Sequence, residues 1–206
     1  METYIFIMEI IGSIAFAVSG AIQAIRNKLD IFGVAVLGLV TAVGGGIIRD
    51  IVIGDLPPKM FRDPTCAIIA MITALAVFLF APRAHYAKWA EKVLYVADSI
   101  GLAVFTAVGV ESAYELGHTG LPLMIFVGVI TGVGGGVLRD VFTGTVPYIF
   151  RKHIYATASL AGVLAIWLCA KFLDYTVAMA IGAILIVIIR LFAILFHLNL
   201  PKSQEI

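Results

Sequence analysis

The sequence has little charge for its length. Only 13% of its 206 residues are Asp, Glu, Lys or Arg, whereas soluble chains carry roughly 25%. In contrast, 62% are hydrophobic, and the mean hydropathy is +1.08. The net charge of +1 also lacks the basic excess that a nucleic-acid-binding protein needs. The composition therefore excludes a soluble domain and a nucleic-acid-binding protein, and it predicts an integral membrane protein.

Cysteine and catalytic motifs are scarce as well. Cys66 and Cys169 both lie in apolar runs, so the sequence offers no disulfide framework and no CxxC metal signature. It also contains no HExxH motif and no convincing set of nucleophile, base and acid. The sequence therefore predicts no enzyme, no metal site and no cofactor.

Long apolar runs are what the sequence has in abundance. Each is long enough to cross about 30 Å of hydrocarbon as a helix, and a helix satisfies its backbone groups within the segment. The runs are Tyr4–Ile25, Ile31–Ile53, Thr65–Ala81, Val93–Leu116, Leu121–Phe142, Ile154–Leu173 and Thr176–Leu198. The sequence thus predicts an all-α integral membrane protein with seven transmembrane helices in a single membrane domain, residues 1–206.

The chain contains an internal repeat. The segment TAVGGGIIRD from Thr41 to Asp50 recurs as TGVGGGVLRD from Thr131 to Asp140, identical at seven of ten positions. Outside these segments, Gly54 and Pro57 recur as Gly144 and Pro147, and with a one-residue shift Glu9, Phe16 and Gly20 recur as Asp98, Phe105 and Gly109. We therefore predict two three-helix units, residues 4–81 and 93–173, and a seventh helix at 176–198.

The number of helices in each unit decides their orientation. Because three is odd, the second unit must enter the membrane from the opposite side to the first. Inverted repeats of this kind are the construction of many transporters, whose path lies at the repeat interface along interrupted helices. The second and fifth helices, which carry the glycine triplets, are the predicted interrupted pair.

The basic residues of the loops predict the orientation of the whole chain. With the N-terminus outside, eight basic residues fall in inner segments and three in outer loops. The inner ones are Arg26, Lys28, Arg83, Lys88, Lys92, Arg151, Lys152 and Lys202, and the outer ones are Lys59, Arg62 and Lys171. The C-terminus is therefore expected in the cytoplasm.

The two glycine triplets allow two interpretations. Three successive glycines cost about 1 kcal/mol each relative to Ala in a helix, so they favour broken helices whose freed carbonyls line a water-filled path and bind a monovalent cation. The alternative is close helix packing through small-residue stripes. The glycines concerned are Gly44, Gly45, Gly46, Gly134, Gly135 and Gly136.

An Arg-Asp pair follows each triplet, Arg49–Asp50 and Arg139–Asp140. Neighbours on a helix point about 100° apart, so each side chain is expected to find its partner on another helix or in water. Ionisable residues within a membrane are functional candidates. The alternative is that each arginine reaches the far interface, because 18 apolar residues precede it.

Further polar residues within the spans are secondary candidates. Thr41 and Thr131 are expected to bond either the broken backbone or the carbonyl four residues earlier. The remaining candidates lie near predicted helix ends and are Glu9, Asp98, Glu111, Glu115 and Arg190.

Each of these has two interpretations. Glu9 and Asp98 either attract cations at the two mouths or favour a helix N-terminus. Glu111 and Glu115 either concentrate cations on the outer side or form a solvated helix end. Arg190 either contacts a lipid phosphate or extends to the interface.

The doubled Gly-Gly-Gly-[Ile/Val]-[Ile/Leu]-Arg-Asp motif, the layout and the length resemble prokaryotic members of the trimeric intracellular cation (TRIC) channel family. Their repeat is also known as the glycine transporter domain, and the resemblance reaches to about residue 198. It implies a homotrimer with one pore per protomer, conducting K⁺ and, less selectively, Na⁺. It also implies that the second and fifth helices kink at their glycines and line the pore.

One departure from the family bears on location. Animal members carry a Lys-containing motif where this chain has Gly134–Gly136, and the glycines favour a prokaryotic cell membrane over an internal store. The expected partners are two further copies of the chain and membrane lipids, including a bound lipid, with no nucleic acid and no obligatory protein partner.

Two functions are consistent with these residues. The first is a channel for monovalent cations, in which Asp50 and Asp140 offset the repulsion of cations by the arginines. The second is a carrier for a small zwitterion such as glycine, with Arg49 or Arg139 holding the carboxylate and the neighbouring Asp the ammonium. A scaffold or lipid-binding protein without transport is a third class.

Overall fold

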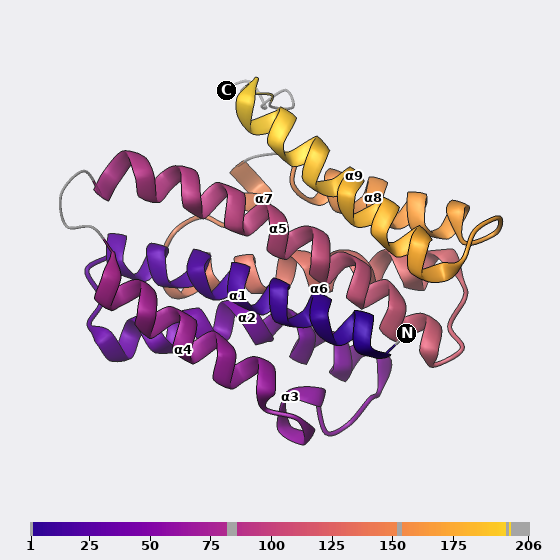
Figure 1. Ribbon diagram of the computed structural model, residues 1–206, viewed down its shortest axis with the longest axis horizontal. Helices are drawn as coiled ribbons and strands as arrows, with labels where there is room; N and C mark the ends of the chain where they lie inside the picture. The colour runs from indigo at the N-terminus through magenta and orange to yellow at the C-terminus, as the bar shows by residue number, and fades with distance from the viewer. Residues whose placement is uncertain (1, 82–85, 152–153, 197, 199–206) are drawn as a thin grey trace, which may run out of the picture.

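Nine α-helices make up the regular structure of residues 2–81, 86–151, 154–196 and 198, the part of the chain that this computed structural model describes. The long helices α1, α2, α5 and α6 run side by side, and α8 and α9 lie over one end of them (Figure 1). The helices are α1 (Glu2–Arg26), α2 (Ile31–Ile53), α3 (Lys59–Arg62), α4 (Thr65–Phe80), α5 (Tyr86–Glu115), α6 (Leu121–Phe142), α7 (Tyr148–Arg151), α8 (Ala156–Cys169) and α9 (Tyr175–Leu195).

Five of the helices are long and apolar enough to cross a membrane: α1, α2, α5, α6 and α9. The helices α4 and α8 are also apolar but shorter, with 16 and 14 residues. The predicted all-α fold is therefore confirmed for the described residues, whereas the number of seven crossings stays a prediction.

The ends of the helices follow local capping rules. The Asp30 carboxylate accepts a hydrogen bond of 2.8 Å from the Gly33 N–H and so caps α2. Gly54 ends α2 with φ at 76°, and Gly144 takes a similar φ of 64° just after α6. Each glycine supplies a left-handed turn that a side chain would strain.

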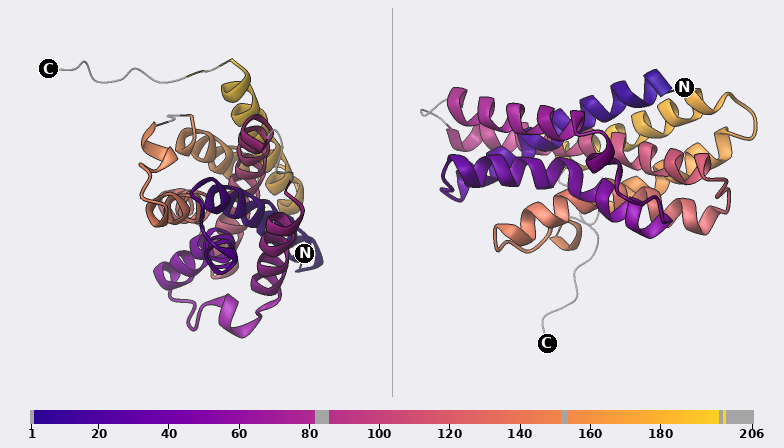
Figure 2. Two further views of the ribbon diagram at one scale, coloured as in Figure 1. Left: turned by 90° about the vertical axis from the view of Figure 1, so that its left-hand side faces the viewer. Right: turned by 90° about the horizontal axis from the view of Figure 1, so that it is seen from below.

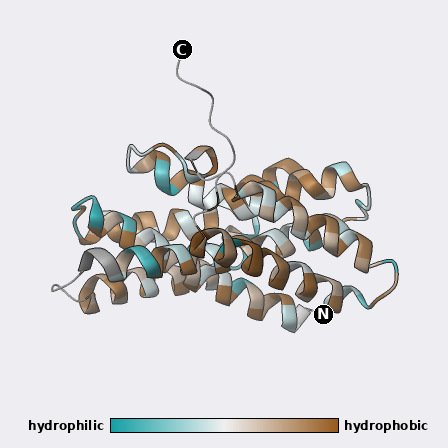
Figure 3. Cartoon of the chain, turned by 90° about the horizontal axis from the view of Figure 1, so that it is seen from above, coloured by the Kyte–Doolittle hydropathy of each residue, from teal (hydrophilic) through white to brown (hydrophobic). Residues whose placement is uncertain are grey.

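Many large apolar side chains are exposed on the outside of the bundle, and apolar residues predominate along its helices (Figure 3). Phe80 and Phe172 are more than 80% exposed, and Ile72 is 62% exposed. A soluble protein rarely shows so much contiguous apolar surface, so this surface fits a hydrocarbon environment.

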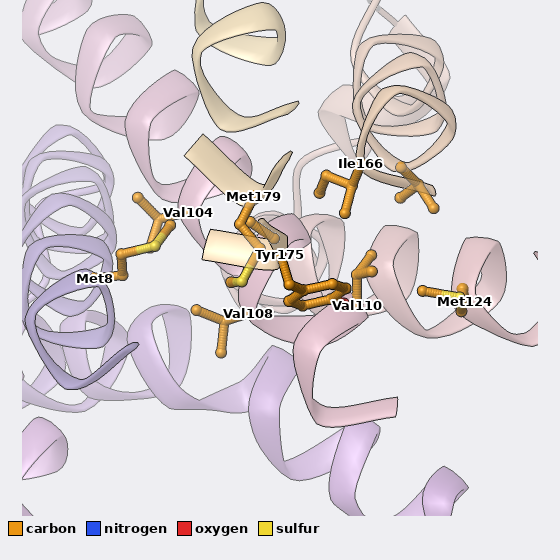
Figure 4. Packing of buried hydrophobic residues seen from close by; sticks show 10 residues of the cluster. Met8, Val104, Val108, Val110, Met124, Ile166, Tyr175 and Met179 are labelled. Atoms are coloured by element: carbon orange, nitrogen blue, oxygen red, sulfur yellow. The ribbon is translucent and has the colours of Figure 1, made fainter. Parts of the chain in front are cut away.

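A buried cluster holds α5, α6, α8 and α9 together (Figure 4). Met179 lies against Tyr175 in this cluster, and Val108 and Val110 approach them from α5. The other end of the bundle is packed with smaller residues, Ala21, Ala24 and Ala74 among them.

Corresponding helices of the two halves of the chain cross in an antiparallel sense. The rings of Phe16 on α1 and Phe105 on α5 stack with centroids 5.3 Å apart. Phe16 also covers Gly101, and Phe105 covers Gly12, so low numbers on one helix meet high numbers on the other. The short helices α3 and α7 lie at opposite edges of the bundle (Figures 1 and 2).

Candidate functional site

The glycine triplets do not break their helices. Both α2 and α6 continue as α-helix through Gly44–Gly46 and Gly134–Gly136. The expectation of broken backbone is thereby corrected, because the tertiary contact of α2 with α6 offsets the low helix propensity of glycine.

Gly45 and Gly135 form the closest approach of the two helices. A methyl group on Gly45 would collide with the carbonyl oxygen of Thr131, and one on Gly135 would collide with the carbonyl oxygen of Thr41. A methyl group on Gly44 would meet the flexible end of the Leu138 side chain, which can move aside. Close packing, the alternative interpretation of the triplets, therefore explains Gly45 and Gly135.

The last glycine of each triplet faces polar side chains instead. A methyl group on Gly46 would meet only the Arg49 Nη2 atom, at 3.9 Å. A methyl group on Gly136 would lie 2.9 Å from the Tyr155 hydroxyl and 3.5 Å from the Asp98 Oδ1 atom. These two glycines therefore lie beside polar and charged side chains rather than against the opposite helix.

Thr41 and Thr131 satisfy their own helices. The Thr41 Oγ1 donates to the Leu37 carbonyl at 2.6 Å, and Thr131 donates to the Val127 carbonyl at the same distance. The simpler of the two interpretations is therefore correct, since no broken backbone exists for them to bond.

Each Arg-Asp pair is a direct ion pair, contrary to the expectation from helix geometry. The Arg49 Nε donates to the Asp50 Oδ1 at 2.8 Å, and the Arg139 Nε donates to the Asp140 Oδ1 at 2.9 Å. The Cβ directions do diverge, but the long arginine side chain curls back to the neighbouring carboxylate.

The first cluster gathers two acids and two bases from α1, α2 and α3. Besides the Arg49–Asp50 pair, the Lys59 Nζ donates to both carboxylate oxygens of Glu9, at 2.7 and 2.8 Å. The Lys59 backbone N–H donates to the Asp50 Oδ2 at 2.8 Å. A cavity of about 50 Å³ lies among these residues, and Ser13 lines it too.

The second cluster has the same charge balance, and its charged side chains are all buried, whereas Lys59 of the first is 46% exposed. The Arg139 Nη1 donates to the Asp98 Oδ1 at 2.7 Å and also to the Ser19 hydroxyl. The Arg190 Nη2 lies 3.7 Å from the other Asp98 oxygen, and its guanidinium lies over the Tyr155 ring at 4.7 Å. A cavity of about 340 Å³ lies beside Arg139 and opens toward α7.

The structure thus revises three candidates. Glu9 and Asp98 are buried and paired with bases, and Asp98 lies well inside α5 rather than at its start. Arg190 is only 2% exposed, so it meets Asp98 and the Ile154 carbonyl rather than a lipid phosphate. The sequence predicts Arg190 near the end of the last helix. In the structure, this part of α9 directs the Arg190 side chain into the bundle interior.

Glu111 and Glu115 differ from each other. Glu115 is exposed, as a solvated helix end should be. Glu111 is only 1% exposed, and neither of its carboxylate oxygens has a hydrogen-bond partner among the described residues. The interpretation of both as a solvated end is therefore wrong for Glu111.

Several site residues were not candidates from the sequence. Lys59, Ser13, Ser19 and Tyr155 carry no motif, and each joins a cluster through contacts distant in sequence. Among the bases that predict the orientation, Arg83, Lys152 and Lys202 lie outside the described residues, as do the side chains of Lys88 and Arg151.

Two corresponding charge clusters therefore lie on either side of the α2–α6 contact. Each holds two acids and two bases and is therefore balanced, although Arg139 is shared between Asp140 and Asp98 whereas Glu9 has Lys59 to itself. The equivalent backbone hydrogen bonds repeat as well, from Lys59 to Asp50 and from Tyr148 to Asp140, both at 2.8 Å. Because each cluster is balanced, its arginines do not exclude cations by a net positive charge.

Solved structures and family models provide the decisive comparison. The chain matches a TRIC cation channel with a TM-score of 0.86, at 35% identity over 97% of both chains. A family model described as glycine transporter matches residues 6–82 and again residues 95–171. The chain belongs to the glycine transporter family. Its fold is that of the TRIC channels, and the resemblance inferred from the glycine motifs is confirmed.

Another TRIC structure agrees. The trimeric intracellular cation channel orthologue from Rhodobacter sphaeroides has a TM-score of 0.87 at 34% identity, over 95% of this chain and 100% of that one. The matched members of the glycine transporter family and the TRIC neighbours are channels and transporters rather than enzymes.

Curated relatives of this glycine transporter family member are bacterial membrane proteins. A membrane protein of Deinococcus radiodurans is 43% identical, over 89% of this chain and 84% of its own length. The inner membrane protein YadS of Escherichia coli is 40% identical, over 96% and 95%. The chain is accordingly a helical membrane protein.

Proposed function

We propose that this chain forms a channel for monovalent cations. The observation that carries the proposal is the match of nearly the whole chain to a TRIC cation channel at 35% identity. The two balanced charge clusters support it, because each arginine is neutralised by an adjacent carboxylate and does not repel a cation. K⁺ is the proposed permeant ion, with Na⁺ less favoured, and no cofactor is required.

We propose a topology of seven crossings with inverted repeats at 4–81 and 93–173 and a last helix at 176–198. The antiparallel crossing of α2 with α6 supports it, since Gly45 meets Thr131 while Gly135 meets Thr41. The double match of one family model also supports two units. The N-terminus would lie outside and the C-terminus inside.

The proposed path follows the two clusters past the α2–α6 contact. The last glycine of each triplet, Gly46 or Gly136, lies beside the polar side chains of a cluster. The first cluster would face the outside and the second the cytoplasm. Alongside them, the proposed path-lining residues are Thr41, Gly44, Gly45, Arg49, Asp50, Thr131, Gly134, Gly135, Arg139 and Asp140, with Glu9 and Asp98 at the two cavities.

We propose that three copies assemble in the cell membrane of a prokaryote, each with its own path. The TRIC orthologue from Rhodobacter sphaeroides is described as trimeric, and the relatives include an inner membrane protein. The large exposed apolar surface leaves room for contacts with both lipid and neighbouring copies.

Planar-bilayer recording of the purified protein under a KCl gradient tests the channel. We expect discrete unitary currents that reverse near the K⁺ equilibrium potential, with smaller currents when NaCl replaces KCl. Protein-free bilayers and bilayers with heat-denatured protein are the controls. Silence from monodisperse, folded protein would contradict the proposal.

The alternative function is a carrier for a small zwitterion such as glycine, favoured by the description of the matched family model. In that case Arg139 would hold the carboxylate of the substrate. Saturable uptake of labelled glycine into proteoliposomes that is lost in Arg139→Ala would support the carrier and contradict the channel.

A further inference from the structure

The two acids that correspond in the repeats are neutralised in different ways. Asp98 lies between Arg139 and Arg190, whose side chains are 1% and 2% exposed and cannot leave without unpacking the bundle. Glu9 is paired with Lys59, whose side chain is 46% exposed. Arg49 bonds Asp50 but, unlike Arg139, makes no ion pair with the acid on the neighbouring long helix in the described structure. Glu9 therefore has an exchangeable counter-ion.

Lys59 is attached so that its side chain can move while its backbone stays fixed. Its N–H is held by the Asp50 Oδ2 at 2.8 Å. It begins the four-residue helix α3, which lies at the lower edge of the bundle in Figure 1. A rotation about the flexible four-carbon stem would take the ammonium group from Glu9 to solvent.

The cavity behind Lys59 holds oxygen atoms that suit a small cation, beside the Arg49 guanidinium that is paired with Asp50. It measures about 50 Å³, which exceeds the 10–15 Å³ that one water-sized sphere requires. Glu9, Asp50 and Ser13 line it, and the Ser13 hydroxyl is buried without a hydrogen-bond partner among the described residues. Gly46 leaves the backbone of α2 open on the same side.

We propose that this cavity is a binding position for one monovalent cation, and that the Lys59 ammonium group is a tethered competitor for it. Carboxylate and hydroxyl oxygens can take the place of hydration water around a monovalent cation. An ammonium group is itself a compact, hydrated charge, so it can stand where K⁺ would stand. The inference rests on the proposed channel, and it assigns to Lys59 control over how readily an ion occupies the outer half of the path.

Removal of the competitor tests the inference. In Lys59→Met, we expect the K⁺ concentration that gives half-maximal conductance to fall about tenfold, because a tethered group has an effective concentration in the millimolar range or above. Arg62→Gln is the matched control, since Arg62 lies on the same short helix but pairs with Asp55. An unchanged K⁺ dependence in Lys59→Met would overturn the inference.

A binding measurement separates this inference from the channel itself. Cys66 lines the same cavity and is half-buried, so in a Cys169→Ser background a cationic thiol reagent reports on access to the cavity. K⁺ is expected to slow this reaction relative to choline, and to do so at about tenfold lower concentration in Lys59→Met. Protection without conductance would support the site and contradict the channel. Conductance without protection would support the channel and overturn the site.

A second variant controls for the case in which Lys59→Met does not fold. Glu9→Gln with Lys59→Met removes both charges and leaves no unpaired carboxylate at this position. We expect it to fold and to lose protection of Cys66 by K⁺. Protection that persisted at the wild-type K⁺ concentration would overturn the role of Glu9 as a ligand.

Discussion

Glu111 places a buried carboxyl group near Tyr175 and Glu115, where neither of its oxygens has a hydrogen-bond partner among the described residues. In the first repeat the corresponding residue is Ile22, by the same one-residue shift that relates Gly20 to Gly109, and it is fully buried. The fold therefore does not need a polar side chain at this position. Tyr175, on α9, also has a buried hydroxyl without a partner among the described residues.

Replacement of Glu111 by isoleucine is expected to stabilise the protein. Burial of an unpaired polar group costs about 1–3 kcal/mol, so Glu111→Ile should raise the thermal unfolding midpoint in detergent by about 3 °C or more. The control is the reverse change at the corresponding position of the first repeat, Ile22→Glu, which should lower the thermal unfolding midpoint. A midpoint that fell in Glu111→Ile would show that this carboxyl group contributes to folding through a contact of its own.

The glycines of α2 differ in how closely they pack against α6. We expect Gly45→Ala to lower the thermal midpoint by about 5 °C or more, because its methyl group collides with the Thr131 carbonyl. Gly46→Ala should leave the midpoint equal or higher, since alanine favours helix by about 1 kcal/mol and its methyl group would make only an ordinary van der Waals contact, with the Arg49 Nη2 atom at 3.9 Å. The reverse order of midpoints would contradict the observed packing.

The sequence predicted helices better than contacts. The bounds of α2 and α6 are those predicted, because an N-cap residue, Asp30 or Gly120, stands directly before each apolar run. The helix α5 begins seven residues before the predicted Val93. Charged residues such as Glu91 and Lys92 end an apolar run, but they are equally compatible with a helix that leaves the membrane.

The charged clusters were predictable only in part. Adjacent Arg and Asp identified the right region, but helix periodicity describes Cβ directions and not the reach of a long side chain. The bond from Lys59 to Glu9 joins residues 50 positions apart, and no motif marks either end. The close packing of Gly45 against Thr131 depends on how α2 crosses α6, which the sequence of neither helix determines alone.

The loops that follow α2 and α6 should lie on opposite sides of the membrane. Leu56 and Val146 follow equivalent helices, α2 and α6, and are 62% and 50% exposed. In a background without Cys66 and Cys169, we expect Leu56→Cys to react with a membrane-impermeant maleimide in intact cells. Val146→Cys should react only after the membrane is opened.

Labelling of both positions from the same side would contradict the inverted arrangement. Labelling of Val146→Cys alone in intact cells would keep the inversion but reverse the predicted orientation. A single cysteine at Asn27, which is exposed in the short loop after α1, is a matched control and should behave like Val146→Cys.

The pairing of Phe16 with Phe105, and of Gly45 with Gly135, has a consequence for the origin of the chain. At both places a residue meets its own counterpart, so each half presents one surface that serves as both sides of the contact. Interfaces with this property are self-complementary. A half-length ancestor bearing Phe16, Thr41 and Gly45, inserted in both orientations, would satisfy the geometry for pairing with itself, and gene fusion would then have freed Glu9 and Asp98 to diverge.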